Sequence, residues 1–129
     1  MGFAISEGGL LNLSEKYFQG RVAGIGCISC LLDGRENPYV SIHHIWGRVG
    51  KRRHYMVLPL CRPHHQGEIE ARKLGYVSVH PDKARFESIY GEQEHLLVLV
   101  NAILDGVLSR RDLISIHQDT FMSGVPNVD

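Results

Sequence analysis

The chain has 129 residues, of which 43% are hydrophobic and 22% are charged, and it carries 14 basic and 14 acidic side chains. This composition is typical of a globular protein, and no apolar run is long enough to cross a bilayer, which argues against a membrane protein. The first residues lack a basic start followed by an apolar block, so no secretory signal is predicted. We expect one domain over 1–129, with an N-terminal helix region at about 1–19 and a C-terminal tail at about 109–129.

The balance of charge is uneven along the chain. Residues 48–85 contain nine Lys or Arg and three Asp or Glu, which gives +6, whereas the remaining residues sum to −6. The same segment is rich in histidine, so a locally positive field accompanies groups that bind metals and transfer protons. A neutral total charge therefore does not exclude nucleic acid as a partner. A solvated run of charges is the alternative interpretation of "GKRRH" taken alone.

The first half of the chain predicts a helix followed by a β-hairpin. Ser14 is a candidate N-cap for a helix over 15–23, with Tyr17, Phe18 and Val22 on its apolar face. β-branched and aromatic residues predict two strands, and a glycine-bounded basic loop joins them. The segments are the turn 33–38, the strand 39–45, the loop 47–53 and the strand 54–61.

The second half of the chain predicts mostly helix. We expect a short helix over 64–75, an extended segment over 75–81, and a helix that begins at Pro81 or Asp82 and ends at Gly91. The apolar pattern of 92–108 predicts a core helix. From Ser109 onward we expect at most one further helical turn and then a loose tail. The order of helix, hairpin and helices predicts an α+β fold.

Two pairs of residues have the spacing of zinc ligands. The segment "CISC" and the segment "CRPH" each place two ligand-type side chains three positions apart, which lets both point at one ion. Together they form a Cys3His set for a structural zinc (Zn²⁺): Cys27, Cys30, Cys61 and His64. Three cysteines, an odd number with a CxxC pair, also favour reduced thiols and a cytoplasmic protein. Buried cysteines without a metal are the alternative.

The two His-His pairs, 43–44 and 64–65, leave three histidines after His64 is used for the zinc site. His43 and His44 are neighbours on a predicted strand, so their side chains point to opposite faces and cannot serve one site in the same way. One of them can hold a metal while the other approaches from the side. His65 follows the second zinc segment and can reach back across the hairpin. This pattern predicts a metal ion and a general base in one cleft.

The joint pattern "CISC…IHHI…LPLCRPHHQ" resembles the HNH or ββα-metal nucleases, in which a hairpin and a helix hold one divalent ion. More closely, "IHHIWGR", "HYMVLPLCRPHHQG", "SVHP" and "KARFESIYG" resemble the Ref family of phage recombination-enhancement proteins, from about Gly20 to about Leu99. That family consists of RecA-dependent DNA endonucleases with an HNH-like fold. The resemblance implies an HNH-like ββα-metal core with a pair of structural zinc knuckles, plus flanking helices.

The resemblance also implies roles for four histidines. His44 corresponds to the general base that takes a proton from the attacking water, and His43 and His65 correspond to ligands of the catalytic ion. His80, in "SVHP", corresponds to a further active-site histidine, which we expect to be another metal ligand. A second divalent ion is therefore expected, either Mg²⁺, Mn²⁺ or Zn²⁺. A site rich in nitrogen favours zinc or another transition metal over magnesium.

DNA is the expected substrate, and a RecA filament in a bacterial host is the partner that the resemblance implies. Four basic residues in the hairpin loop are candidates for contacts with phosphates, namely Arg48, Lys51, Arg52 and Arg53. His54 is expected to contact phosphate or to be exposed. Two alternatives remain: a zinc-finger module that binds DNA or protein without catalysis, and a RecA-independent HNH endonuclease of the restriction or homing type. A finger alone binds one ion, whereas a finger with an active site binds two.

Overall fold

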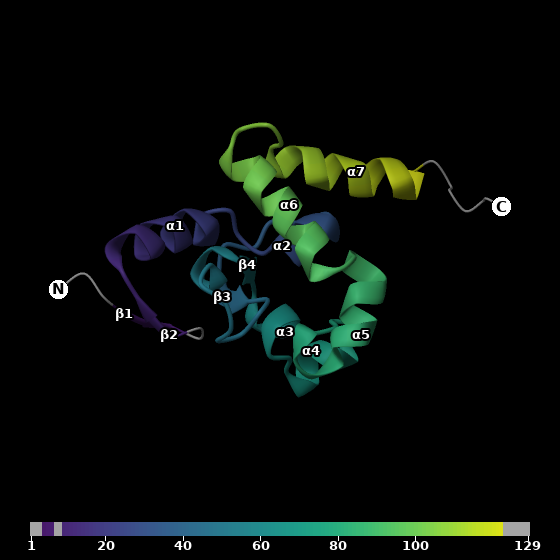
Figure 1. Ribbon diagram of the computed structural model, residues 1–129. Helices are drawn as coiled ribbons and strands as arrows, with labels where there is room; N and C mark the ends of the chain where they lie inside the picture. The colour runs from purple at the N-terminus through teal and green to yellow at the C-terminus, as the bar shows by residue number, and fades with distance from the viewer. Residues whose placement is uncertain (1–3, 7–8, 123–129) are drawn as a thin grey trace.

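The computed structural model describes residues 4–6 and 9–122 and has the predicted α+β architecture (Figure 1). Helices dominate, and the strands form two small antiparallel hairpins. In chain order the elements are β1 (Ala4–Ser6), β2 (Gly9–Leu11), α1 (Leu13–Ala23), α2 (Ile28–Leu32), β3 (Ser41–His44), the 3₁₀ turn η1 (Arg53–Tyr55), β4 (Val57–Leu60), α3 (Arg62–His65), α4 (Ile69–Lys73), α5 (Val79–Tyr90), α6 (Gln93–Leu104) and α7 (Arg110–Met122).

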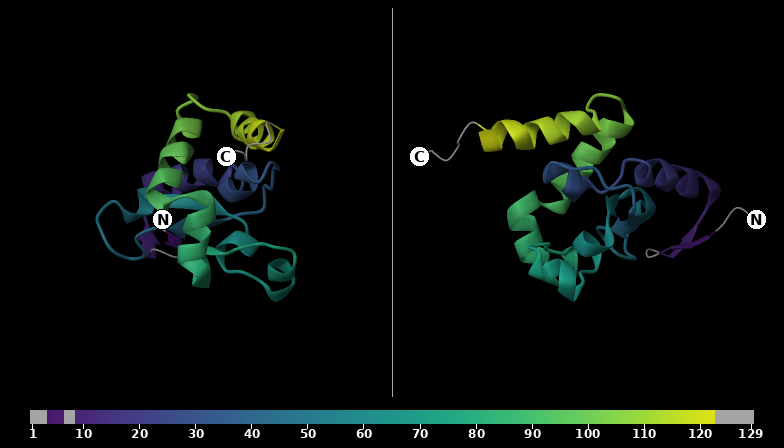
Figure 2. Two further views of the ribbon diagram at one scale, coloured as in Figure 1. Left: turned by 90° about the vertical axis from the view of Figure 1, so that its right-hand side faces the viewer. Right: turned by 180° about the vertical axis from the view of Figure 1, so that it is seen from behind.

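The β3–β4 hairpin lies at the centre of the molecule, and its prediction is confirmed. The two strands are antiparallel, with His43 opposite Leu58 and His44 opposite Val57. All four residues of β4 are buried, because the strand has protein on both faces. Both views in Figure 2 place α3, α4 and α5 at one end of the molecule and α7 at the other, with the hairpin between them.

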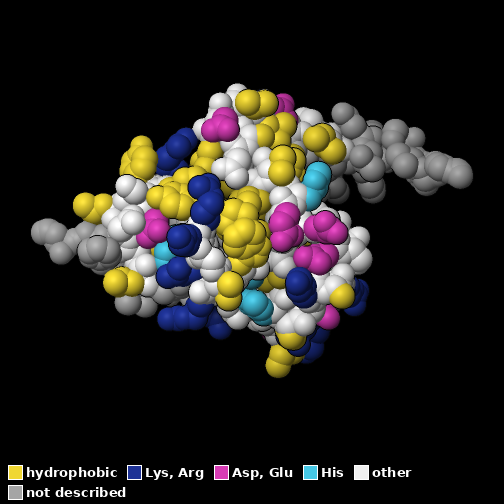
Figure 3. All heavy atoms as spheres, in the orientation of Figure 1, with side chains coloured by type: hydrophobic (Ala, Val, Ile, Leu, Met, Phe, Trp, Pro, Cys, Tyr) yellow, Lys and Arg dark blue, Asp and Glu magenta, His cyan; other side chains and the backbone are white. Residues whose placement is uncertain are grey.

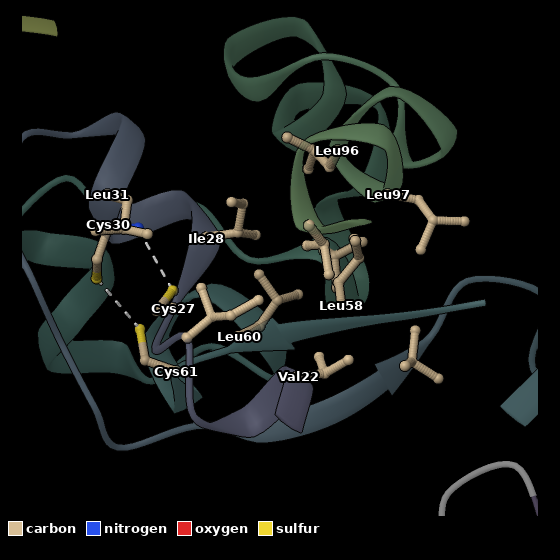
Figure 4. Close-up of a cluster of buried hydrophobic side chains, with 14 of the residues drawn as sticks. Val22, Cys27, Ile28, Cys30, Leu31, Leu58, Leu60, Cys61, Leu96 and Leu97 are labelled. Atoms are coloured by element: carbon tan, nitrogen blue, oxygen red, sulfur yellow. Dashed lines mark hydrogen bonds between the residues drawn. The ribbon is translucent and has the colours of Figure 1, made fainter. Parts of the chain in front are cut away.

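One hydrophobic core joins the hairpin to the helices. Leu58 and Leu60 from β4 pack with Ile28 from α2 and Leu96 from α6, and all four are fully buried. Figure 4 shows Ile28 and Leu60 near the cysteines, with Leu58 and Leu96 on the far side of the same cluster. Burying a leucine or isoleucine side chain contributes about 1.5–3 kcal/mol, so this core holds the hairpin in place against α2 and α6. In the part of the chain that the structure describes, no helix is long and apolar enough to cross a membrane.

The ends of the first and last helices differ from the predictions. Asn12, and not Ser14, caps α1, where Asn12 and Glu15 exchange side-chain and backbone hydrogen bonds of 2.9 Å.

Helix α7 replaces most of the expected tail. Ser109 and Asp112 form the same kind of reciprocal cap at its start, and Leu113 is buried. The S-x-x-D pattern at 109–112 is the sequence signal for this helix start, and the prediction of a loose tail did not take it into account. Residues 123–129 of the predicted tail, and parts of the predicted region 1–19, lie outside the described residues.

The segment from 62 to 91 is more broken than predicted. The single helix expected over 64–75 is two short helices, α3 and α4, which are separated at Gly67. Gly67 has a φ of +79°, and a Cβ there would lie 2.7 Å from the Ser78 hydroxyl oxygen, so only glycine fits. The segment 75–81 forms no strand, although His80 itself has extended backbone angles before α5 continues. Gly91 ends α5 as predicted, and α6 is the predicted core helix.

Candidate metal centre and active site

The four predicted zinc ligands lie together and are buried. Cys27 precedes α2 and Cys30 lies within it, while Cys61 precedes α3 and His64 lies within that helix. Their ligand atoms all lie within 4.8 Å of one another. Figure 4 shows the thiols of Cys30 and Cys61 pointing toward each other, with Cys27 beside them.

The distances between these atoms fit a tetrahedral zinc site. Zn–S and Zn–N bonds of about 2.3 and 2.0 Å place two sulfurs about 3.8 Å apart, and a sulfur and a nitrogen about 3.5 Å apart. The Sγ atoms of Cys30 and Cys61 are 3.8 Å apart. His64 Nδ1 lies 3.4 Å from the Sγ of Cys27, 3.6 Å from that of Cys30 and 3.3 Å from that of Cys61. These four residues could therefore hold a metal such as zinc.

The acid–base properties of these side chains also favour a cation. Burial raises the pKa of the Cys27 thiol far above its usual range, and the neighbouring thiols raise it further. Hydrogen bonds from Cys27 and Cys61 lower the pKa of Cys30 well below its usual range. Burial by itself lowers the pKa of His64, but hydrogen bonds with Asp33 and the cysteines outweigh it and raise that pKa to about 11. Burial thus favours a neutral thiol at Cys27, and a divalent ion held by the four side chains would compensate the charge of thiolates at this site.

Two residues outside the zinc-ligand set orient His64. Its Nε2 lies 3.0 Å from the Tyr90 hydroxyl and 3.4 Å from Asp33 Oδ2, and Tyr90 donates a 2.8 Å hydrogen bond to Asp33. Burial and the charge of Asp33 raise the pKa of Tyr90, which keeps its proton on the hydroxyl. With Nε2 held by these partners, His64 presents Nδ1 to the sulfurs. Asp33 begins the predicted turn 33–38, and no local pattern in the sequence indicates its contact with His64.

Replacing Asp33 with alanine is expected to weaken zinc binding by about 10–100-fold, because the partner that orients His64 is removed. Competition with a chelator of known zinc affinity measures the change. Asp105→Ala, which alters an exposed carboxylate after α6, is the matched control and should bind zinc as the wild type does. Equal affinity of Asp33→Ala and wild type would show that the protein orients His64 without Asp33.

A second group of histidines comes together beside the hairpin. His43 lies on β3, His65 lies on α3, and His80 stands at the start of α5. Their ring centroids are 5.0 to 5.5 Å apart, and their ligand atoms lie within 4.8 Å of one another. His43 and His65 are buried, whereas His80 is exposed, so the group opens to solvent on one side. These three imidazoles could therefore hold a metal ion.

Buried polar partners select which nitrogens face this centre. His43 Nε2 donates a 2.6 Å hydrogen bond to Gln93 Oε1, and the Gln93 amide nitrogen donates to Glu87 Oε2 at 3.2 Å, which sets the orientation of the amide. Nδ1 of neutral His43 then carries the lone pair. On the other side, His65 Nδ1 lies 2.7 Å from the Ser41 hydroxyl. That hydroxyl donates to the carbonyl of Leu60, so His65 presents Nε2 to the centre.

His44 lies apart from this group, because neighbouring residues on β3 point to opposite faces. Its Nε2 is 3.0 Å from His54 Nδ1 and 3.5 Å from the Gln19 side-chain nitrogen, and Gln19 also binds the His54 carbonyl. The expectation that His54 is exposed or contacts phosphate is wrong: His54 is 2% exposed, like His44. The single turn η1 directs the His54 side chain inward. The basic residues beside His54 in the sequence predict an exposed loop instead. The role of His44 as a base stays a prediction.

A comparison with protein families identifies the family to which this chain is related. A family model described as "recombination enhancement, RecA-dependent nuclease" matches residues 13–105. The chain belongs to this family. The match runs from the start of α1 to just past the end of α6, so it contains both groups of metal-binding side chains and extends beyond the resemblance seen at Gly20–Leu99.

Membership in the RecA-dependent nuclease family makes this chain an enzyme with nuclease activity and implies DNA as a partner. The four candidate phosphate contacts lie between β3 and β4. Arg48, Lys51 and Arg52 are exposed, and Arg53 is half-buried and hydrogen-bonds the carbonyl of Gly50. Figure 3 shows Lys and Arg side chains gathered at the left of the molecule and a group of Asp and Glu side chains at the right, with further basic side chains below that group and histidine visible between the two sides.

Proposed function

We propose that this protein is a metal-dependent DNA endonuclease of the HNH type that acts on DNA in RecA filaments or strand-exchange intermediates during phage recombination. The observation that carries the proposal is the convergence of His43, His65 and His80 beside the β3–β4 hairpin. Family membership supports the nuclease class, and two metal-binding groups separate the protein from a simple zinc finger. We place the enzyme in the cytoplasm of the bacterial host, where RecA filaments form, and treat 1–129 as one domain.

The HNH assignment is supported by the order of the elements around the histidines. A hairpin, β3–β4, is followed directly by α3. Two of the candidate ligands, His43 and His65, come from the strand and the helix of this unit, and His80 comes from the start of α5. The zinc group joins the start of α2 to the start of α3, so it anchors the helix that carries His65. We infer that this unit is the ββα-metal core and that the other helices support it.

In the proposed reaction, a water oxygen attacks the scissile phosphorus and the bond to the 3′ oxygen breaks. We propose His44 as the group that takes the proton of the water, the role that the family resemblance implies. Its Nε2 contacts His54 Nδ1 at 3.0 Å, and its Nδ1 is buried on the face of β3 away from His43, so the step requires that DNA binding brings water to His44. His43, His65 and His80 would hold a divalent ion, which would supply positive charge for the phosphate and the departing oxygen. Nitrogen ligands favour zinc or another transition metal over Mg²⁺.

Incubation of the purified protein with circular single-stranded DNA and homologous duplex DNA tests this proposal. With RecA, ATP and Mg²⁺ or Mn²⁺, we expect cleavage of the DNA that RecA covers, and none when RecA or ATP is omitted. Metal analysis should give two ions per chain. Cleavage without RecA would support the nuclease assignment and contradict the dependence on RecA. Binding of DNA without cleavage under any metal would favour the non-catalytic module.

A further inference from the structure

A surface pocket of about 410 Å³ adjoins the group of three histidines. Its lining residues come from the segment before and at the start of β3 and from one face of α3: Tyr39, Val40, Ser41, Arg62 and Gln66. The hydroxyl of Ser41 lies 2.7 Å from His65 Nδ1, so one wall of the pocket is one hydrogen bond away from a proposed metal ligand. An occupant of the pocket would therefore lie next to the reacting phosphate.

Residues 39–43 run from this pocket to the group of three histidines. Ser41 and His43 contact the proposed active-site residues and Ile42 packs against the hydrophobic core, whereas Val40 contacts the core and also lines the pocket. Tyr39 stands on the pocket side and is 83% exposed. At about 3.3 Å per residue, Tyr39 lies about 13 Å along the chain from His43. Stacked nucleotides rise about 3.4 Å each, so this length corresponds to about four nucleotide steps.

The chemistry of the pocket fits a nucleotide. Tyr39 offers an exposed aromatic face, on which any base can stack. Arg62 and Gln66 are four positions apart in sequence at the opposite wall and supply hydrogen-bond donors. The Arg62 side chain, which lines the pocket, is 75% exposed, and its Nε pairs with Glu68 at 2.9 Å.

We propose that this pocket binds one nucleotide of the DNA strand that is being cut, within about four steps of the scissile phosphate. Its base stacks on Tyr39, and Arg62 contacts a neighbouring phosphate. The inference rests on the proposed nuclease function and adds a subsite that positions the strand. A base can stack on Tyr39 only where it is unpaired, so the pocket selects single-stranded or locally opened DNA.

Fluorescence of single-stranded oligonucleotides that carry 2-aminopurine at successive positions tests the subsite. Binding is measured to the full-length protein without added divalent ion, so that hydrolysis does not consume the probe. Wild type should quench the probe at one or two positions, and Tyr39→Ala should remove that quenching and raise the dissociation constant about tenfold. Tyr39→Phe retains the ring and should behave as wild type does. Tyr17→Ala, which removes an exposed aromatic ring from α1, is the matched control.

The salt dependence of binding tests the phosphate contact. If Arg62 binds one phosphate, Arg62→Gln should reduce the slope of log K against log salt by about 0.7 for a single strand. Unchanged binding and quenching in Tyr39→Ala would overturn the subsite. If wild type cleaves DNA while Tyr39→Ala binds and cleaves equally well, the subsite fails and the proposed function stands. If wild type never cleaves but Tyr39→Ala loses binding, the subsite stands and the proposed function fails.

Discussion

The substitution His44→Ala is expected to lower the rate of DNA cleavage by about 10²–10⁴-fold, the usual contribution of a positioned general base. His44 lies on the opposite face of β3 from His43, so its removal should leave the content of both metal ions unchanged. Single-turnover cleavage of labelled DNA in RecA filaments, together with metal analysis, measures both effects. His43→Ala should instead lose the second ion as well as the activity.

Two further variants keep this test interpretable. His44 is 2% exposed, so alanine leaves a cavity, and His44→Gln preserves most of the side-chain volume without a base of suitable pKa. Both variants should be inactive and folded by circular dichroism. His95→Ala, an exposed histidine on α6, should cleave as wild type does. Full activity in His44→Gln would assign proton transfer to another group.

The substitution Cys61→Ser is expected to remove the structural zinc and to unfold much of the domain at physiological temperature. Zinc binding in small Cys/His sites contributes about 10–16 kcal/mol, which is comparable with the total stability of a domain, about 5–15 kcal/mol. Cys61 joins the end of β4 to α3, so loss of the ion also frees the helix that carries His65. We expect a fall in melting temperature of about 10 °C or more, measured by thermal denaturation.

A chelator separates the loss of metal from the loss of packing. Cys61 is 1% exposed and belongs to the core, so serine also has a small packing cost. An excess of chelator should lower the melting temperature of wild type nearly to that of Cys61→Ser, and should have little effect on the variant. A melting temperature of wild type that does not respond to chelator would show that the Cys3His group does not stabilise the fold through a metal.

Spacing in the sequence predicts the four candidate zinc ligands, but it does not predict the side chains that hydrogen-bond the candidate metal ligands. Cys27, Cys30, Cys61 and His64 are visible in the sequence because two short local patterns each place two ligands on one side of a turn. Gln93 is 50 positions from His43, and Asp33 is 31 positions from His64, so no local pattern connects them. The burial of His54 was missed for a related reason. Its neighbours are basic and predict an exposed loop, whereas η1 turns this one side chain toward His44.

The α+β order of elements, the hairpin, the core helix α6 and the candidate zinc ligands could be predicted from the amino-acid sequence, because they depend on periodicity and spacing within short segments. Which histidines meet depends instead on tertiary packing. Packing of β4 against α2 and α6 fixes the hairpin, and the alternation along β3 then sends His43 toward His65 and His80 and sends His44 toward His54. Contacts across tens of residues arise from burial of the whole core, which no single segment encodes.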